Sequence, residues 1–235
     1  MRRDNLAVGS YYHVVIRGAG GLPFFHDEDD WWLGLKLLYY LNDESLVGST
    51  WRRDLVINKC ALFERPAHWP PRQPRIKILA FCLHDNHIHL LVKEIKGGGL
   101  TAFMRRFPNS LSNCHRMKYR RSGSIFQAAY KLRRIADDGD LQNVALYIMV
   151  KNGLERYPNG GLKGAMSDLE SAWIWAKQDP FSSLPDYAGR RNSPVIERDL
   201  LRTILPEPKK FLLEAREYLK WRDEQKGLIN DFLWE

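Results

Sequence analysis

The strongest constraint on the fold is a pair of apolar segments separated by only three residues. Ile76 to Leu83 is an almost continuous apolar run, His84-Asp85-Asn86 forms a turn, and a second strand pattern extends from His87 to Val92. Short apolar runs bounded by turn residues predict strands. Because a short turn joins the two strands, we expect them to pair as an antiparallel hairpin, with the first strand buried.

The neighbouring segments predict one α+β domain around this hairpin. Ser10 to Arg17 is rich in aromatic and β-branched residues and predicts a first strand. Helices are expected from Asp27 through Leu41, from Leu100 to Tyr119 with a kink or break at Pro108, and from Asp140 through Ile148, and another strand within Phe126 to Ile135. This order is that of a ferredoxin-like split βαβ core with an antiparallel sheet and one extra helix.

The length of 235 residues fits one large domain or two small ones. Four prolines within residues 46–75 predict an irregular insertion, with a short helix near Trp51. Residues 154–196 are predicted to be rich in loops, and a last helix is expected from about Pro208 to Lys226. We therefore expect a main domain at residues 1–190 and a helical C-terminal tail at residues 191–235.

The composition is basic, and it limits the class of partner. Lys and Arg number 36 against 28 Asp and Glu, which leaves a net charge of +8 and a pI near 9.4. This favours a polyanionic partner. The three cysteines form no C-x-x-C pair, so neither a zinc ribbon nor a disulfide framework is indicated. No signal peptide and no membrane-length apolar run are seen, so we expect a cytoplasmic protein without a membrane partner.

Much of the positive charge lies in one segment. Ile95 to Ala136 contains no Asp or Glu, and aromatic residues are interleaved among its basic residues. Guanidinium groups pair with phosphates and aromatic rings stack on unpaired bases, although a solvated basic face over core aromatics is the alternative. The candidate nucleic-acid contacts are Arg17, Arg105, Arg106, Arg116, Lys118, Arg120, Arg121, Lys131, Arg133 and Arg134.

The sequence His87-Ile88-His89 is the sharpest local motif. Residues two apart on a strand point to the same face, so the two imidazoles can chelate one divalent cation. The pattern also occurs in purely structural histidine pairs. His13 lies on the first strand and could face the same site or the core, and His84 ends the strand before His87. Neither has a spacing that identifies it as a ligand.

Tyr147 lies beside the apolar face of the helix that follows Asp140, and Lys151 follows one turn later. A phenol is a poor nucleophile near neutral pH unless a metal ion or another cation assists it, and Lys151 can supply a positive charge. The alternative is a core tyrosine beside a solvated lysine.

Taken together, these segments resemble the single-tyrosine HUH transposases, in particular the REP-associated tyrosine transposase branch. The resemblance extends over roughly residues 9–190. The matching segments are YHVVIRG (12–18), FFHDEDD (24–30), AFCLHDNHIHLLVK (80–93), SIFQAAYK (124–131) and LYIMVKNGL (146–154).

The resemblance implies a catalytic main domain that nicks and transfers single-stranded DNA at hairpins. It implies Mg²⁺ or Mn²⁺ bound by His87 and His89, Tyr147 as the nucleophile, and a 5′-phosphotyrosine intermediate with a free 3′-hydroxyl. No nucleotide cofactor is needed, because the phosphotyrosine link conserves the phosphodiester energy. It further implies a nucleoid-associated enzyme that acts as a monomer or a homodimer.

The chain departs from the family pattern at the end of the tyrosine helix. Relatives usually read Y-I-H-L-N-P, whereas this chain reads Tyr147-Ile148-Met149-Val150-Lys151-Asn152-Gly153. Lys151 replaces the amide that is expected to be a third metal ligand, and a protonated lysine has no free lone pair. Asn152 lies about 100° further round an α-helix, so it can substitute only if the helix end unwinds. Lys151 is instead expected to assist catalysis.

A second departure lies at Phe126-Gln127-Ala128-Ala129, where the FQGR-type segment of relatives has an arginine. These departures keep a second hypothesis open, namely a DNA-hairpin-binding protein derived from such a transposase but impaired in catalysis. A third hypothesis is an RNA-binding ferredoxin-like module, which the strands disfavour because they lack the RNP1 pattern.

Overall fold

A four-stranded antiparallel sheet forms the centre of the computed structural model, which describes residues 6–46 and 50–225. Its strands are β1 (Tyr11–Arg17), β2 (Ile76–Leu83), β3 (His87–Glu94) and β4 (Lys131–Arg134), in the spatial order β2-β3-β1-β4. β1 pairs with β3 and β4, and β2 pairs with β3, all antiparallel. With helices after β1 and β3, this is the ferredoxin-like split βαβ arrangement, and the predicted fold class is confirmed.

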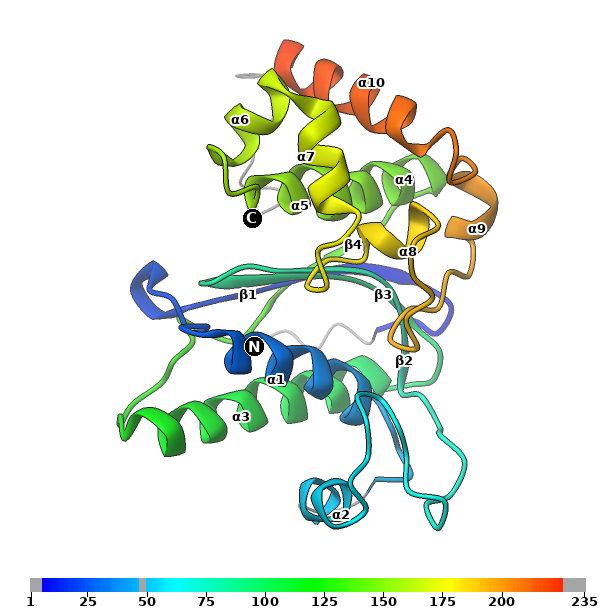
Figure 1. Cartoon of the computed structure of the whole chain (residues 1–235). Coiled ribbons are helices and arrows are strands. Elements are labelled where there is room, and N and C mark those ends of the chain that lie inside the picture. The colour runs from blue at the N-terminus through cyan, green and yellow to red at the C-terminus, as the bar shows by residue number, and fades with distance from the viewer. Residues whose placement is uncertain (1–5, 47–49, 226–235) are drawn as a thin grey trace.

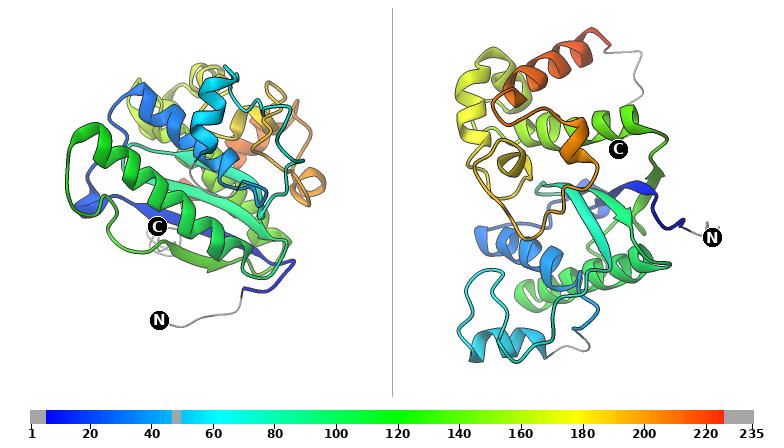
Figure 2. Two further views of the ribbon diagram at one scale, coloured as in Figure 1. Left: turned by 90° about the horizontal axis from the view of Figure 1, so that it is seen from below. Right: turned by 90° about the vertical axis from the view of Figure 1, so that its right-hand side faces the viewer.

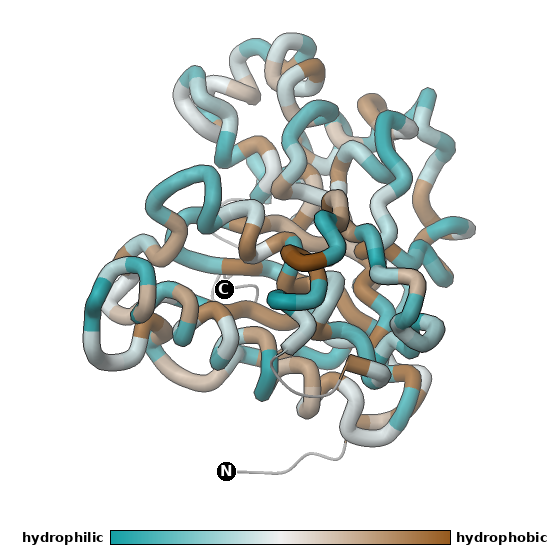
Figure 3. The backbone as a smooth tube through the Cα atoms, turned by 60° about the horizontal axis from the view of Figure 1, so that its bottom comes forward, coloured by the Kyte–Doolittle hydropathy of each residue, from teal (hydrophilic) through white to brown (hydrophobic). Residues whose placement is uncertain are grey.

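Helices cover both faces of the sheet (Figures 1 and 2). α1 (Glu28–Tyr40) and α3 (Gly99–Tyr119) lie on one face. α4 (Asp138–Leu146), a π-helical turn η2 (Tyr147–Lys151) and α5 (Asn152–Glu155) form one continuous helical segment on the other. The apolar side chains of the strands divide accordingly into two core clusters, and Figure 3 shows hydrophobic stretches running through the middle of the molecule.

The alternation of side chains along β3 assigns each residue to one face. Ile88 and Leu90 belong to the core beneath α1 and α3, whereas Leu91 belongs to the core beneath α4 and η2. His89 therefore points toward α4 and η2, because residues two apart on a strand share a face. Burial on both faces fixes this register, since a slip of β3 by one residue would move the side chains of each face to the opposite face.

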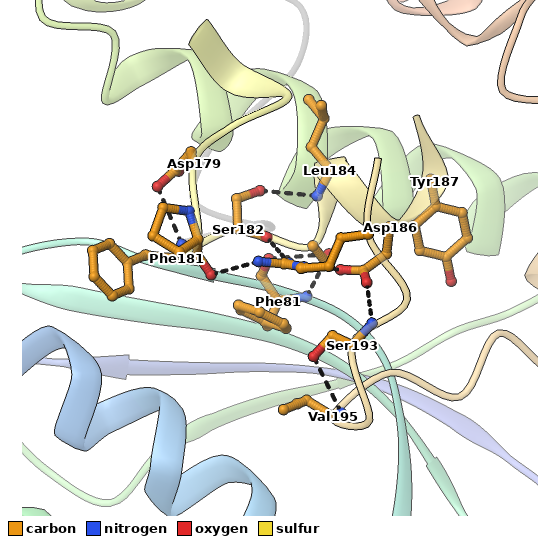
Figure 4. Close-up of polar contacts among 12 residues, drawn as sticks. Phe81, Asp179, Phe181, Ser182, Leu184, Asp186, Tyr187, Ser193 and Val195 are labelled. Carbon is orange, nitrogen blue, oxygen red and sulfur yellow. Dashed lines mark hydrogen bonds and ion pairs between the residues drawn. The ribbon is translucent and has the colours of Figure 1, made fainter. Parts of the chain in front are cut away.

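The outer edge of β2 is covered by residues that follow α7 (Leu169–Ala176). Ser183 donates its backbone N–H to Phe81 O at 2.9 Å and accepts the Phe81 N–H on its hydroxyl at 2.9 Å. Asp186 accepts the backbone N–H of Ser193 at 2.6 Å, which holds the next part of this segment in place (Figure 4). The unpaired hydrogen-bonding groups of an edge strand are satisfied in this way within the chain.

Three short helices occupy the region that was predicted to be rich in loops, namely α6 (Gly161–Ser167), α7 (Leu169–Ala176) and α8 (Leu184–Tyr187). That prediction was wrong because helices this short display little periodicity in sequence. α7 is stabilised by its N-cap, where Asp168 accepts the Ser171 N–H at 3.1 Å, and by burial of Trp173.

The sequence predicts a kink or a break at Pro108. α3 runs through Pro108 as one helix, so the break does not occur. Phe103, Phe107 and Leu111 are almost fully buried on both sides of the proline, so packing against the core holds the two halves in one helix.

The strand predicted within Phe126 to Ile135 is confirmed as β4, Lys131–Arg134. Phe126 lies outside this strand and forms an isolated bridge with Gly18.

The remaining elements are η1 (Ala19–Gly21), α2 (Trp51–Ile57), α9 (Leu201–Ile204) and α10 (Phe211–Glu224). α2 is the short helix expected near Trp51; part of the predicted insertion, residues 47–49, lies outside the described residues. No helix in residues 6–46 and 50–225 is both long enough and apolar enough to cross a membrane.

The C-terminal segment packs over η2 and α4 and contributes to the same core cluster. Phe211, Ala215 and Leu219 of α10 are buried in the cluster that contains Ile148. Asp199 is held against the sheet by Lys77 at 2.7 Å and Lys93 at 2.8 Å. The domain boundary near residue 190 remains a prediction. The core cluster that contains Ile148 includes side chains from before and after this position.

Glu94 joins the end of the histidine strand to α3. Its buried carboxylate accepts the backbone N–H groups of Gly99 and Leu100, both at 2.8 Å, and so satisfies two of the unpaired donors at the start of the helix.

We therefore expect Glu94→Ala to lower the free energy of unfolding by about 3 kcal/mol, because two buried N–H groups lose a charged acceptor. Urea denaturation measures this loss. The control is Glu64→Ala, which removes an acceptor from the exposed N–H of Ala61 and should cost less than about 1 kcal/mol. Equal losses in the two variants would show that Glu94 has no special role in starting α3.

Candidate active site

The two histidines of β3 lie side by side on the face of the sheet covered by α4 and η2. The ring centroids of His87 and His89 are 4.9 Å apart, and their planes are nearly perpendicular. His89 is fully buried, whereas His87 at the start of the strand is half-buried. His89 thus lies in the core, and His87 lies nearer the surface.

Two more histidines join them. His13 Nε2 lies 3.0 Å from His89 Nδ1, and these two rings stack with centroids 5.2 Å apart. His84 stacks on His87 with centroids 4.1 Å apart and planes only 10° apart. The sequence left open whether His13 faces the site or the core and did not identify His84 as a ligand, and both belong to this histidine cluster.

Burial favours the neutral form of the inner imidazoles. It lowers the pKa of His13 to about 3, with a further lowering by the charge of Arg133. Burial, followed by the influence of His13 and His87, also lowers the pKa of His89 well below its usual value. A neutral imidazole keeps one nitrogen lone pair, which is the form that can bind a metal ion.

Tyr147 faces this cluster from η2. Its ring centroid lies 5.5 Å from that of His89 and 6.0 Å from that of His13, with the rings edge to face. The side chain is completely buried. Lys151 Nζ and the Arg222 guanidinium each lie 5.0 Å from the centroid of the Tyr147 ring. Two cations therefore accompany the phenol, and each can favour negative charge that develops on its oxygen.

Arg222 belongs to α10, far from the tyrosine in sequence. Nothing in the local pattern of residues 211–224 indicates a role near Tyr147, so the position of Arg222 could not be predicted from sequence. The contact depends on α10 packing over η2, as Figure 1 shows.

The π turn changes the position of Asn152 relative to Tyr147. The backbone N–H of Asn152 bonds to the Tyr147 carbonyl, a separation of five residues instead of the four of an α-helix. The side-chain amide of Asn152 donates to the same carbonyl at 3.2 Å. A π turn accommodates one extra residue, so Asn152 takes the hydrogen-bonding place that the fourth residue after Tyr147 has in an α-helix.

Lys151 is the extra residue that the π turn accommodates. Its Nζ lies 2.8 Å from Glu155 Oε1 and 3.4 Å from Asn152 Oδ1. Because Glu155 offsets part of its charge, Lys151 repels a nearby cation less than an unpaired lysine would.

The candidate nucleic-acid contacts fall into two groups. Seven of them are exposed, namely Arg105, Arg116, Lys118, Arg120, Arg121, Lys131 and Arg134. Arg17, at the end of β1, lies opposite His87 in the strand register. Arg106 and Arg133 are only partly exposed, and these two and Lys118 contact other residues of the chain.

Arg106 donates to the backbone carbonyl of Leu46 at 2.7 Å, and Lys118 pairs with Asp30 at 2.8 Å. Arg133 forms a bidentate pair with Asp140, at 2.8 and 2.9 Å. The basic segment also spans both sides of the sheet, because α3 lies on the face opposite η2 (Figure 1).

A metal ion fits the donor atoms that this site offers. His89 Nε2 is buried and has no hydrogen-bond partner among the described residues, and a buried polar atom of this kind favours an additional ligand. No group of three His, Cys, Asp or Glu side chains within residues 6–46 and 50–225 is arranged to hold a metal.

Comparisons with known proteins agree with the sequence motifs. Residues 71–151, about a third of the chain, match the family described as "Transposase IS200 like". This segment contains β2, β3, α3 and Tyr147, and it confirms the resemblance to the tyrosine transposases. Curated protein sequences give no significant match.

Among solved structures, the chain is similar to one described as "Structure of the REP associates tyrosine transposase bound to a REP hairpin". The TM-score is 0.43 and the sequence identity 13%, and the match covers 84% of this chain and 89% of the other.

The π turn can be tested by deletion. We expect deletion of Lys151 to convert η2 into an α-helix while leaving Tyr147 and Asn152 in place, at a cost of no more than about 2 kcal/mol. Thermal unfolding followed by circular dichroism measures the cost. The control is deletion of both Val150 and Lys151. The π turn contains only one extra residue, so the second deletion shifts the helical register and should unfold the protein. Equal damage from both deletions would contradict this account of the turn.

Proposed function

We propose that this chain is a metal-dependent enzyme that nicks and transfers single-stranded DNA through a phosphotyrosine intermediate at Tyr147. The observation that supports it best is the packing of the Tyr147 ring edge-on against His89, one of the two histidines of β3. A potential nucleophile and two potential metal ligands thus come together from separate segments.

The reaction is an exchange of phosphodiester bonds. The Tyr147 oxygen forms a bond to phosphorus as the phenol loses its proton, and the bond from phosphorus to the 3′-oxygen breaks. The 3′-oxygen takes up a proton and leaves as a free hydroxyl, while the 5′-phosphate stays on the tyrosine. Attack by a 3′-hydroxyl on this link reverses the steps and joins two strands. Lys151 and Arg222, both near the ring, favour the negative charge on the phenol oxygen.

His87 and His89 are the residues that would hold the metal, and Asn152 is the candidate for an amide ligand after rotation of its side chain. A divalent ion bound there would polarise the scissile phosphate and stabilise its developing charge. Two imidazoles suit a first-row transition ion better than Mg²⁺, so we expect Mn²⁺ to be the more effective ion. Phosphate oxygens and water would complete the coordination.

The substrate must reach a tyrosine that is fully buried. Arg222 of α10 lies over the Tyr147 ring, so α10 or its neighbours must shift before a phosphate can approach. We propose that the exposed basic residues of α3 and β4 bind the backbone of a DNA hairpin, the substrate that the sequence motifs imply.

A covalent adduct tests this proposal. We expect the protein incubated with Mn²⁺ and hairpin-flanked single-stranded oligonucleotides to form an adduct that persists on a denaturing gel. Tyr147→Phe should abolish the adduct, because phenylalanine has no nucleophilic oxygen. Tyr157→Phe is the control, since this mostly buried tyrosine accepts a hydrogen bond from Asn159 away from the histidines.

An adduct that survives Tyr147→Phe would refute the assignment of the nucleophile. Salt-dependent binding of hairpins with no adduct on any oligonucleotide would instead support the second candidate function, a catalytically impaired hairpin-binding protein. The burial of Tyr147 is the observation that favours this second candidate.

The roles of the neighbouring lysine and amide can be separated kinetically. We expect Lys151→Ala to slow adduct formation at saturating Mn²⁺ by about 10-fold or more, because the phenol loses a nearby cation. Asn152→Ala should mainly raise the Mn²⁺ concentration needed for half-maximal rate. The titration of rate against Mn²⁺ distinguishes them, and a faster reaction in Lys151→Asn would show that Lys151 only displaces a ligand.

A further inference from the structure

We propose that His13 is a positioning residue that sets the tautomer of His89, so that the buried Nε2 of His89 presents its lone pair to the metal. This inference rests on the proposed function, and it assigns a role to a histidine that has no ligand spacing in the sequence. His13 lies on β1 opposite Leu91 in the strand register, two residues from Val15, which is opposite His89.

The contact between the two rings allows only two arrangements of protons. His13 Nε2 and His89 Nδ1 are 3.0 Å apart, and a hydrogen bond between them requires that one nitrogen carries the proton and the other accepts it. If His89 Nδ1 donates, His89 Nε2 carries a lone pair. If His13 Nε2 donates, the remaining proton of neutral His89 must lie on Nε2, which can then bind no metal.

The surroundings favour the first arrangement. His89 Nε2 has no hydrogen-bond partner among the described residues, so a proton placed there would be a buried donor without an acceptor. Because His13 is only 2% exposed and His89 fully buried, water has little access to replace the contact. The ring planes are only 15° from parallel and the nitrogens are 3.0 Å apart, and near-parallel planes are compatible with an N–H in the plane of one ring that points to the lone pair of the other.

A hydrogen bond of this kind commonly fixes both the tautomer and the orientation of a metal-binding histidine. His13 thereby acts through His89 and not on the substrate.

The first experiment reads the tautomer directly in the metal-free protein. Heteronuclear NMR of the imidazole nitrogens distinguishes a proton on Nδ1 from one on Nε2. We expect the Nδ1–H form for His89 in the wild type and in His13→Gln, whose side-chain carbonyl can accept the bond. In His13→Phe, which has no acceptor, we expect a mixture or the Nε2–H form. An Nε2–H form in the wild type, or no change in His13→Phe, overturns the inference.

The second experiment measures Mn²⁺ binding by calorimetry. We expect His13→Phe to weaken binding by about 10-fold to 100-fold, and His13→Gln to recover most of the affinity. His115→Phe is the matched control, because His115 is similarly buried but lies on α3, where it contacts His26. Its affinity for Mn²⁺ should equal that of the wild type, and circular dichroism verifies that each variant is folded.

The two experiments separate this inference from the proposed function. Mn²⁺ binding that is lost in His87→Ala but unchanged in His13→Phe overturns the role of His13 and leaves the proposed function in place. A wild-type protein that binds no Mn²⁺ overturns the metal dependence in the proposed function and, with it, the role of His13 toward a metal. The NMR result would then still decide whether His13 sets the tautomer of His89.

Discussion

The packing of the tyrosine turn against the histidine face of the sheet is the contact on which the site depends. β3 directs His89 toward η2 and directs Ile88 to the opposite core, and helices bury both faces. A slip of β3 by one residue would place apolar side chains under Tyr147 and histidines under α3. The same burial that stabilises the fold therefore also selects which side chains meet the tyrosine.

The C-terminal segment is part of this arrangement, because it packs against the helical turn that carries Tyr147. α10 buries apolar side chains against α4 and η2, and it brings Arg222 over the Tyr147 ring. Asp199 binds Lys77 and Lys93 on neighbouring strands, and these ion pairs, together with a bond from Tyr11, hold the pKa of Asp199 below its usual value even though burial alone would raise it. α10 therefore covers Tyr147 and contributes to the core at the same time.

The local pattern predicted the central elements closely because each is marked by an apolar run or by turn and capping residues at its ends. β2 runs from Ile76 to Leu83 as predicted, and β3 begins at His87. α1 begins after Asp27, whose carboxylate accepts the Asp30 N–H at 3.1 Å, as its sequence position suggests. Tertiary contacts decided what local preference left open: core packing carries α3 through Pro108 without the break that the proline allowed, and β4 is limited to the residues that β1 can pair with.

The sequence by itself determined the reactive groups: two histidines on one face of a strand, a tyrosine on a later helix, and an acid-free basic segment between them. Only the tertiary structure decided how they are used. It joined His13 to His89 across strands, brought Asn152 into the turn of Tyr147 through a π-helical register, and placed Arg222 of α10 over the Tyr147 ring. These outcomes depend on contacts between residues distant in sequence and on one hydrogen-bond register, and neither leaves a periodic signal in the chain.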